Sequence, residues 1–213
     1  MSTYAFQGPR RGADRGVLLA HGAGSDKDAP ALKAVASSLA DAGVPSLRFD
    51  YPYRVAKKRA PDRAPVLDRA TRDAAAELAK RAGLPAERLV LGGRSMGGRY
   101  CSLIVGDEEV PVPALGLLLL GYPLHPAGQP DRLRVDHFPR LRMPCLFVSG
   151  TRDSLAGRDA LAKAANAIKG KVAFHWLESA DHGYRPLKAS GRTLPDVVAE
   201  VAEVSAAWVT KLR

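Results

Sequence analysis

Short apolar runs alternate along this chain with longer segments in which apolar residues recur every three or four positions. The apolar runs predict β-strands at residues 17–20, 44–49, 89–91, 114–120, 145–149 and 172–177. The segments with helical spacing predict α-helices at residues 30–42, 65–82, 99–105, 158–169 and 194–212. Strands that alternate with helices favour an α/β fold, in which helices cover both faces of a mostly parallel sheet of six to seven strands.

Two further features of the pattern concern packing. The closing helix is expected to bury a stripe made up of Val197, Val201, Val204, Trp208 and Leu212. The longest irregular segment, residues 121–143, is rich in Pro, Arg and His, and loops of this length are usually functional or cover a site. It is too short to form a helical cap domain, so we expect a small lid or none.

The segment at residues 92–98 has the sequence GGRSMGG and joins a predicted strand to a predicted helix. A serine between two glycines at such a junction fits a nucleophile elbow, G-x-S-x-G, in which a sharp turn presents the hydroxyl for attack. The glycines are needed because a larger side chain would clash where the helix and the strand pack closely. Ser95 is therefore the candidate nucleophile.

Candidates for the acid and the base follow two other predicted strands. Asp153 lies just after the strand at residues 145–149, and His182 lies on the loop after the strand at residues 172–177. In a sheet of this kind, catalytic groups gather at the carboxyl ends of the strands. A serine hydroxyl needs an imidazole to take its proton, and the imidazole needs a carboxylate to fix its tautomer and stabilise its cation. Ser95, Asp153 and His182 also follow one another in the chain order of α/β-hydrolases.

Small residues at positions 21–24, with the sequence HGAG, follow the strand at residues 17–20. They would let backbone N–H groups approach a developing oxyanion. We assign one donor to Ala23, with Gly22 or Gly24 as alternatives. The second donor is the N–H of Met96, directly after the nucleophile.

Other residues are weaker candidates for these roles. Asp181 adjoins His182, and its side chain is expected to point away from the ring nitrogen that the acid must hold. Asp50 follows a strand, where we expect it to shape a loop. The remaining histidines are also poorly placed. We expect His21 to orient its own loop, His125 and His137 lie in the irregular segment, and His175 lies inside a predicted strand. No two histidines have i, i+4 spacing, so the sequence predicts no metal site.

Two phosphate-binding motifs are also incomplete. Residues 92–97 have the glycine spacing of a P-loop, but Gly98 and Arg99 stand where Lys and Ser or Thr belong. Residues 22–24 begin like a dinucleotide fingerprint and lack its third glycine. We therefore expect no cofactor.

Composition fits a single domain over residues 1–213, with 46% hydrophobic and 25% charged residues. The first residues, MSTYAF, lack the basic start and apolar stretch of a signal peptide, and no apolar run is long enough to span a bilayer. Cys101 and Cys145 fall inside predicted core elements, which favours buried free thiols and a cytoplasmic location.

The net charge of +10 is the unusual bulk property of the chain. Its arginines are scattered rather than gathered in a stripe, and only 6% of residues are aromatic, so both features argue against nucleic-acid binding. The densest basic run extends from Arg54 to Arg63, where a solvated loop is the simplest interpretation. The sequence does not define an oligomeric state.

With these motifs, the chain resembles the α/β-hydrolase superfamily over nearly its whole length, and more narrowly a small dienelactone-hydrolase-like group. The resemblance rests on the motifs above and on shorter stretches at residues 48–52, 61–63, 121–126 and 150–153. It implies an α/β-hydrolase fold with a minimal lid, a Ser95–Asp153–His182 triad and hydrolysis of an ester or similar acyl bond. The chain departs from the pattern at its start, where the usual leading strands are missing or reduced to residues 3–6.

These observations favour a serine hydrolase that cleaves a small ester or thioester through an acyl-enzyme intermediate, with a small-molecule acyl substrate as its partner. A non-catalytic scaffold of the same fold and an acyltransferase that uses the same residues are the alternatives. Arg94 and Arg99 flank the nucleophile, where they would either favour an acidic acyl group or form surface salt bridges.

Overall fold

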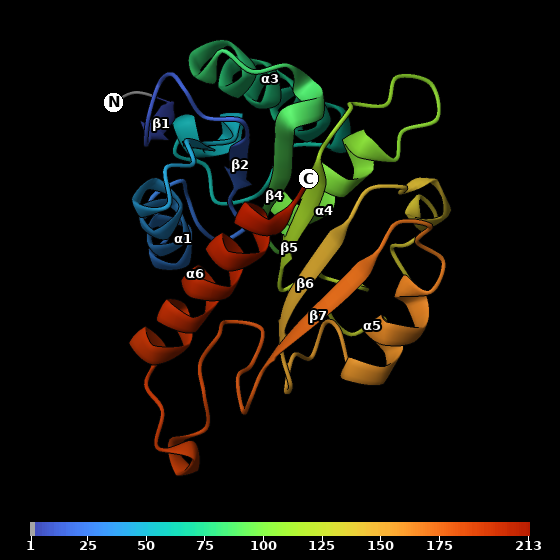
Figure 1. The fold of residues 1–213 in the computed structure, drawn as a ribbon. Coiled ribbons are helices and arrows are strands. Elements are labelled where there is room, and N and C mark those ends of the chain that lie inside the picture. The colour runs from blue at the N-terminus through green and yellow to red at the C-terminus, as the bar shows by residue number, and fades with distance from the viewer. Residues whose placement is uncertain (1–2) are drawn as a thin grey trace.

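The computed structural model describes residues 3–213, and in this range seven strands form one sheet in the order β1-β3-β2-β4-β5-β6-β7 (Figure 1). The strands are β1 (Tyr4–Gln7), β2 (Gly16–Ala20), β3 (Ser46–Phe49), β4 (Leu89–Arg94), β5 (Gly116–Leu120), β6 (Cys145–Gly150) and β7 (Val172–Leu177). β1 pairs with β3 in the antiparallel sense, and the other neighbours are parallel. The carboxyl ends of β2 to β7 therefore meet at one edge of the sheet.

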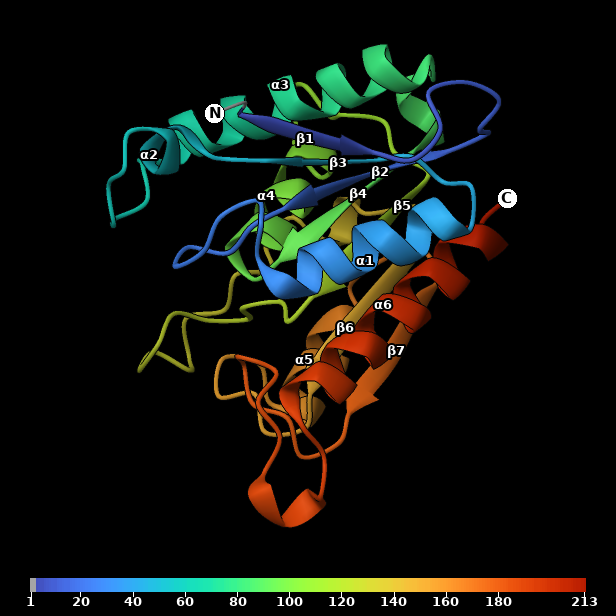
Figure 2. The same cartoon turned by 90° about the vertical axis from the view of Figure 1, so that its left-hand side faces the viewer.

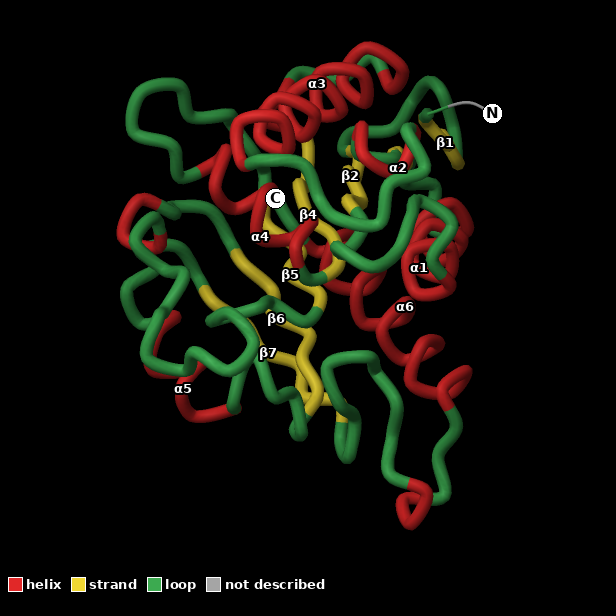
Figure 3. The backbone as a smooth tube through the Cα atoms, turned by 180° about the vertical axis from the view of Figure 1, so that it is seen from behind, coloured by secondary structure: helices red, strands yellow, loops and turns green. Residues whose placement is uncertain are grey.

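Helices cover both faces of this sheet. They are α1 (Pro30–Asp41), α2 (Pro52–Val55), α3 (Ala64–Ala82), α4 (Met96–Val105), α5 (Arg158–Ala165) and α6 (Leu194–Lys211), with short 3₁₀ turns η1 (Ala86–Arg88), η2 (Phe138–Arg140) and η3 (Lys188–Ser190). Figures 1 and 3, which view opposite sides, show α1 and α6 on one face and α3, α4 and α5 on the other. In Figure 2, α1 and α6 run side by side. The α/β-hydrolase architecture expected from the sequence is thus present.

The central strands are buried on both faces, which is why they are continuous apolar runs in the sequence. In β2, Val17 and Leu19 pack with α1 and α6, whereas Leu18 and Ala20 face the core under α3 and α4. Successive side chains of a strand point to opposite faces, so one short run serves both cores. Full burial of each such side chain contributes about 1.5–3 kcal/mol.

The helix ends carry the expected local signals. Proline occupies the first turn of α1, α3 and α6, where its missing N–H has no helical partner to lose. Thr193 and Asp196 form a reciprocal capping box at the start of α6. Gly83 ends α3 in a left-handed conformation, at φ 65°, as glycine readily does.

Several boundaries differ from the prediction. α5 ends at Ala165 rather than at residue 169, because the chain turns there and the N–H groups of Lys169 and Gly170 both donate to the Leu141 carbonyl. The short helix α2 was not predicted, since four residues are too few for a periodic pattern. The reduced first strand is β1, a four-residue antiparallel edge strand.

All five residues of the predicted stripe pack on one core, and Leu212, directly after α6, is buried. Val197, Val201 and Val209 are fully buried, whereas Val204 and Trp208 are only partly buried against the same core. Small residues at positions 202, 205 and 206 complete the face that packs on α1. The predicted stripe is confirmed, and it omits these small residues because alanine and serine add no apolar signal to the pattern.

Cys101 and Cys145 are buried free thiols, as predicted. Within residues 3–213, no helix combines the length and apolarity that crossing a membrane requires. Residues 1 and 2, part of the N-terminal stretch for which no signal peptide is expected, lie outside the described residues.

Candidate active site

Ser95 lies at a sharp turn between β4 and α4, with φ 50° and ψ −115°. Its N–H donates to the Leu120 carbonyl of the neighbouring strand at 2.9 Å. A positive φ is strained for a residue other than glycine, and such strain persists only where the surrounding structure enforces it. The backbone therefore has the geometry of the predicted nucleophile elbow.

The glycines around Ser95 permit a very close contact between α4 and the sheet. A Cβ at Gly93 would lie 2.1 Å from the Ala20 carbonyl oxygen, and one at Gly97 would lie 2.3 Å from the same atom. A Cβ at Gly98 would lie 2.6 Å from the Gly93 oxygen. The predicted steric reason for these glycines is confirmed.

Ser95, His182 and Asp153 form one continuous chain of hydrogen bonds. Ser95 Oγ lies 3.0 Å from His182 Nε2, and His182 Nδ1 lies 2.9 and 2.8 Å from the two carboxylate oxygens of Asp153. Because a carboxylate only accepts, Nδ1 carries the ring proton and Nε2 is free to accept from the serine hydroxyl. The structure thus brings together all three residues that the sequence proposed.

The loops that carry the acid and the base are packed directly on each other. A Cβ at Gly150 would lie 2.2 Å from the Ala180 oxygen, and Arg152 N–H donates to that oxygen at 2.9 Å. The Asp153 side chain has no exposed surface, and its Oδ1 also accepts from Leu155 N–H at 2.8 Å. These contacts fix the carboxylate before any substrate arrives.

The competing residues are engaged elsewhere. Asp181 Oδ1 accepts from Arg185 N–H at 2.9 Å and makes no bond to the His182 ring. His175 is paired with Glu200 at 2.6 Å, His137 with Ser102 at 2.8 Å, and His125 Nδ1 with the Pro126 carbonyl at 2.8 Å. None of these histidines is hydrogen-bonded to Ser95.

His21 holds the loop that follows β2, as expected. Its Nδ1–H donates to Gly22 O at 2.8 Å, and its Nε2 accepts from Tyr51 N–H at 3.2 Å. Burial lowers the pKa of His21 below its usual value, which keeps the ring neutral and suits it to one donor and one acceptor role. Asp50 accepts from Lys27 N–H at 2.8 Å, which confirms its role in shaping this loop.

The proposed oxyanion donors lie beside the serine. A Cβ at Gly22 would be 3.6 Å from Ser95 Cβ, so the loop passes directly over the nucleophile. Among residues 3–213, no acceptor is bonded to the N–H of Ala23 or of Met96. Tyr53 Oη donates to Ala23 O at 2.7 Å and fixes this part of the loop. The lack of a bonded acceptor at either amide among the described residues is compatible with the predicted donor role.

Tyr53 and Tyr184 are site residues that the sequence did not reveal. Tyr53 belongs to α2, and Tyr184 has a φ of 67° and lies buried under the Arg94 guanidinium, 4.2 Å from the ring centre. A proline directly before Tyr53 is a signal for a helix start that was available in the sequence.

A cavity of about 670 Å³ opens at Ser95 and His182. Apolar residues of α1 and α6, such as Leu32, Leu194 and Val198, form much of its wall, and Arg94 and Arg185 contribute charge. Within the described chain, neither Arg94 nor Arg99 forms an ion pair, so the salt-bridge interpretation of these two residues was wrong. No group of metal ligands occurs in residues 3–213.

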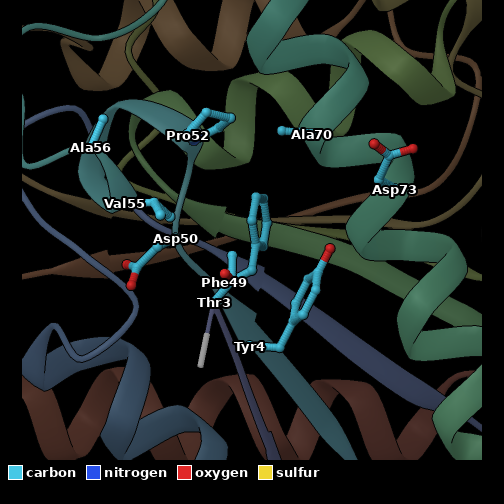
Figure 4. A pocket seen from close by; sticks show the side chains of 9 residues that line it. All are labelled: Thr3, Tyr4, Phe49, Asp50, Pro52, Val55, Ala56, Ala70 and Asp73. Carbon is cyan, nitrogen blue, oxygen red and sulfur yellow. The ribbon is translucent and has the colours of Figure 1, made fainter. Parts of the chain in front are cut away.

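A separate hollow of about 390 Å³ lies between β1, β3, α2 and α3 (Figure 4). Figure 4 shows the Tyr4 and Phe49 rings in its centre and the carboxylates of Asp50 and Asp73 at opposite ends. It contains no Ser, Cys or His, and it shares no lining residue with the cavity at Ser95. The candidate site is therefore the cavity at Ser95.

A strained serine after a central strand, followed along the chain by an aspartate and a histidine at later strand ends, defines the α/β-hydrolase class. Residues 13–210 match the family described as an alpha/beta hydrolase domain. The chain belongs to this family.

Solved structures agree on the fold. A dienelactone hydrolase from Anabaena variabilis is 20% identical over 99% of this chain and 92% of that one, with a TM-score of 0.70. The esterase domain of a Rhodothermus marinus protein is 21% identical over 97% and 91%, with a TM-score of 0.68. Est1E from Butyrivibrio proteoclasticus, with ferulic acid bound, is 17% identical over 98% and 95%, with a TM-score of 0.67. The expected likeness to dienelactone hydrolases is confirmed at the level of the fold.

Proposed function

We propose that this protein is a serine hydrolase that cleaves a small ester or thioester through an acyl-enzyme intermediate. The observation that carries the proposal is the unbroken hydrogen-bond chain from Ser95 Oγ through His182 to Asp153. The strained elbow supports it, because a protein that only binds a partner has no use for a serine held at φ 50°.

In the first half-reaction, Ser95 Oγ attacks the acyl carbon while His182 Nε2 takes the hydroxyl proton. Asp153 stabilises the imidazolium that forms, and the N–H groups of Ala23 and Met96 donate to the oxyanion. Loss of one such donor typically raises the barrier by about 3 kcal/mol. His182 then protonates the leaving alcohol or thiol, and the acyl group remains on Ser95.

In the second half-reaction, His182 removes a proton from water, which attacks the acyl-enzyme, and His182 then returns that proton to Ser95 Oγ as the acid leaves. An alcohol or amine in place of water would give acyl transfer with the same residues. The described chain carries no helical cap domain over the site, so water can reach the acyl-enzyme, and we favour hydrolysis.

The cavity supports a compact, largely apolar substrate, because residues of α1 and α6 form much of its wall. The names of the structural neighbours, a dienelactone hydrolase and esterases, are consistent with an ester or lactone bond as the target. The two buried free thiols support a reducing compartment, and we propose the cytoplasm.

Turnover of p-nitrophenyl acetate tests the proposal. We expect Ser95→Ala and His182→Ala each to lower kcat by about 10³-fold or more, as loss of triad members generally does. Ser37→Ala, on an exposed position of α1, and His175→Gln, away from the cavity, are the matched controls and should retain full activity. Activity that survives Ser95→Ala would overturn the proposal in favour of a scaffold or of another nucleophile.

A further inference from the structure

A third cavity, of about 360 Å³, lies between α4 and the segment at residues 121–143 that joins β5 to β6. Four arginines line it: Arg99, Arg132, Arg134 and Arg140. Figure 2 shows the β5–β6 segment as a yellow-green loop beside α4. This arginine cavity shares no lining residue with the cavity at Ser95.

The positive charge in the arginine cavity is only partly compensated. Arg140 is paired with Glu108 at 2.7 Å, and Asp136 is the one acidic residue in the lining. Among residues 3–213, neither Arg99 nor Arg134 has an ion-pair partner, and Arg99 Nε is buried without a hydrogen bond. Glu108, outside the lining, offsets the charge of Arg140, and Asp136 offsets one of the other three guanidinium charges, so two positive charges remain.

The guanidinium groups of the arginine cavity affect one another electrostatically. Burial and the nearby charges of Arg99 and Arg132 lower the pKa of the Arg134 guanidinium. Like charges at close range repel one another, and the repulsion grows where water is partly excluded. An anion that enters the cavity would offset this repulsion.

The frame of the cavity is fixed independently of any ligand. Ser102 Oγ donates to Arg99 O at 2.8 Å, so it must accept from His137 Nε2–H, also at 2.8 Å, and this bond ties the β5–β6 segment to α4. Tyr122 Oη donates to Arg134 O at 2.7 Å, and Arg134 N–H donates to Leu124 O at 2.8 Å. Since both His137 and Ser102 are almost completely buried, these bonds hold the backbone that carries Arg99 and Arg134 in place.

We propose that the arginine cavity is a binding site for the phosphate group of a small molecule. The two uncompensated cations match the charge of a phosphomonoester, which is about −1.5 to −2 at neutral pH, whereas a carboxylate would neutralise only one. The planar guanidinium fork also matches the oxygen geometry of phosphate. The cavity falls at the lower end of the range of small-molecule sites, about 300–1,000 Å³, which favours a compact ligand over a nucleic-acid backbone.

Isothermal titration of the full chain with inorganic phosphate, at constant ionic strength, tests this site. We expect saturable binding to the wild-type protein. In Arg132→Gln/Arg134→Gln the Kd for phosphate should rise by about tenfold or more. The matched control Arg59→Gln/Arg63→Gln removes the same charge from the exposed basic run and should bind phosphate like the wild type. Equal weakening by both double variants would reduce the effect to net charge and overturn the proposal, as would absence of saturable binding.

Further titrations distinguish phosphate binding in the arginine cavity from binding elsewhere on the protein. Ser95→Ala should bind phosphate unchanged, because the site is distinct from the triad, and loss of binding there would overturn the proposal. Acetate should bind about tenfold more weakly than phosphate, because it carries one charge where the cavity offers two, and equal binding would contradict the proposal.

If thermal denaturation shows that Arg132→Gln/Arg134→Gln is already unfolded, Arg132→Lys/Arg134→Lys replaces it. That variant keeps the charge and should still weaken binding, because lysine lacks the fork. A competition with single-stranded DNA tests for a broad basic surface. Such a surface is indicated, and the proposal overturned, if the DNA displaces phosphate from the wild type and binds more weakly to Arg59→Gln/Arg63→Gln.

Discussion

The replacement of Asp153 by asparagine probes the site without altering its shape. Asp153 Oδ1 accepts from Leu155 N–H at 2.8 Å, so the amide oxygen of an asparagine would keep that position. Its NH₂ group would then stand in place of Oδ2, which lies 2.8 Å from His182 Nδ1. An NH₂ group at this position needs an acceptor, so it favours the tautomer that carries the ring proton on Nε2, in competition with the bond that Nδ1–H can still make to the amide oxygen, where Oδ1 lies 2.9 Å away.

With a proton on Nε2, His182 can no longer accept the hydrogen of Ser95. The carboxylate that stabilises the imidazolium is lost at the same time. The expected loss is about 10⁴-fold in kcat, or roughly 5.5 kcal/mol of transition-state stabilisation. The protein should remain folded, because aspartate and asparagine have the same shape and the hydrogen bond from Leu155 survives.

Stopped-flow hydrolysis of p-nitrophenyl acetate measures this effect. Asp181→Asn is the matched control, since Asp181 is the adjacent carboxylate and its bond from Arg185 N–H can be kept by an amide oxygen. We expect the control to stay within about twofold of the wild type. The reasoning is refuted if Asp153→Asn keeps more than about a tenth of kcat, or if Asp181→Asn loses as much.

Three further results are expected. Gly97→Ala should lower the free energy of unfolding in urea by about 3 kcal/mol or more, because the new Cβ would lie 2.3 Å from the Ala20 oxygen. Gly24→Ala, with no atom within 4 Å, should change it by less than about 0.5 kcal/mol, and equal losses would contradict the account. Ser95→Gly should be more stable than Ser95→Ala by about 1 kcal/mol, because glycine relieves the strain at φ 50°, and identical stabilities would argue against that strain. Burial, with the charges of nearby arginines, lowers the pKa of His137 from 6.5 to about 4. As the pH falls between these two values, His137 therefore becomes protonated in the unfolded chain but stays neutral in the folded chain. Between pH 6.5 and 4 the wild type should therefore lose about 3 kcal/mol more stability than His137→Gln in urea titrations, and parallel curves would count against this explanation.

The presence of a mostly parallel sheet, and the positions of its strands along the sequence, could be predicted because the central strands are buried on both faces. The run from Leu117 to Leu120 has no polar residue, and such a run in a small domain is typical of a central strand. The apolar stripe of α6 could be predicted, but its buried small residues, Ala202, Ser205 and Ala206, could not, since alanine and serine carry no apolar signal.

The triad could be predicted because local sequence marks each of its members. Ser95 has a glycine motif around it, and Asp153 and His182 each follow a recognisable strand, so parallel topology alone brings them to one edge. The loop contacts that fix them, such as Gly150 against Ala180, depend on tertiary packing and have no sequence signature.

The arginine cavity could not be predicted at all. Arg99 lies on a helix, and Arg132, Arg134 and Arg140 lie in an irregular segment more than 30 residues away in the sequence. Scattered arginines of a basic chain have no period or spacing that distinguishes them from a solvated surface. Only the fold places these four around one hollow.

Mapping of the adduct formed with a fluorophosphonate probe tests the central claim most directly. Peptide mass spectrometry of the labelled protein should place the phosphonyl group on Ser95, and intact-mass analysis of Ser95→Ala should show no adduct. Labelling that persists in Ser95→Ala, or that maps to any other residue, would contradict the assignment of Ser95 as the nucleophile.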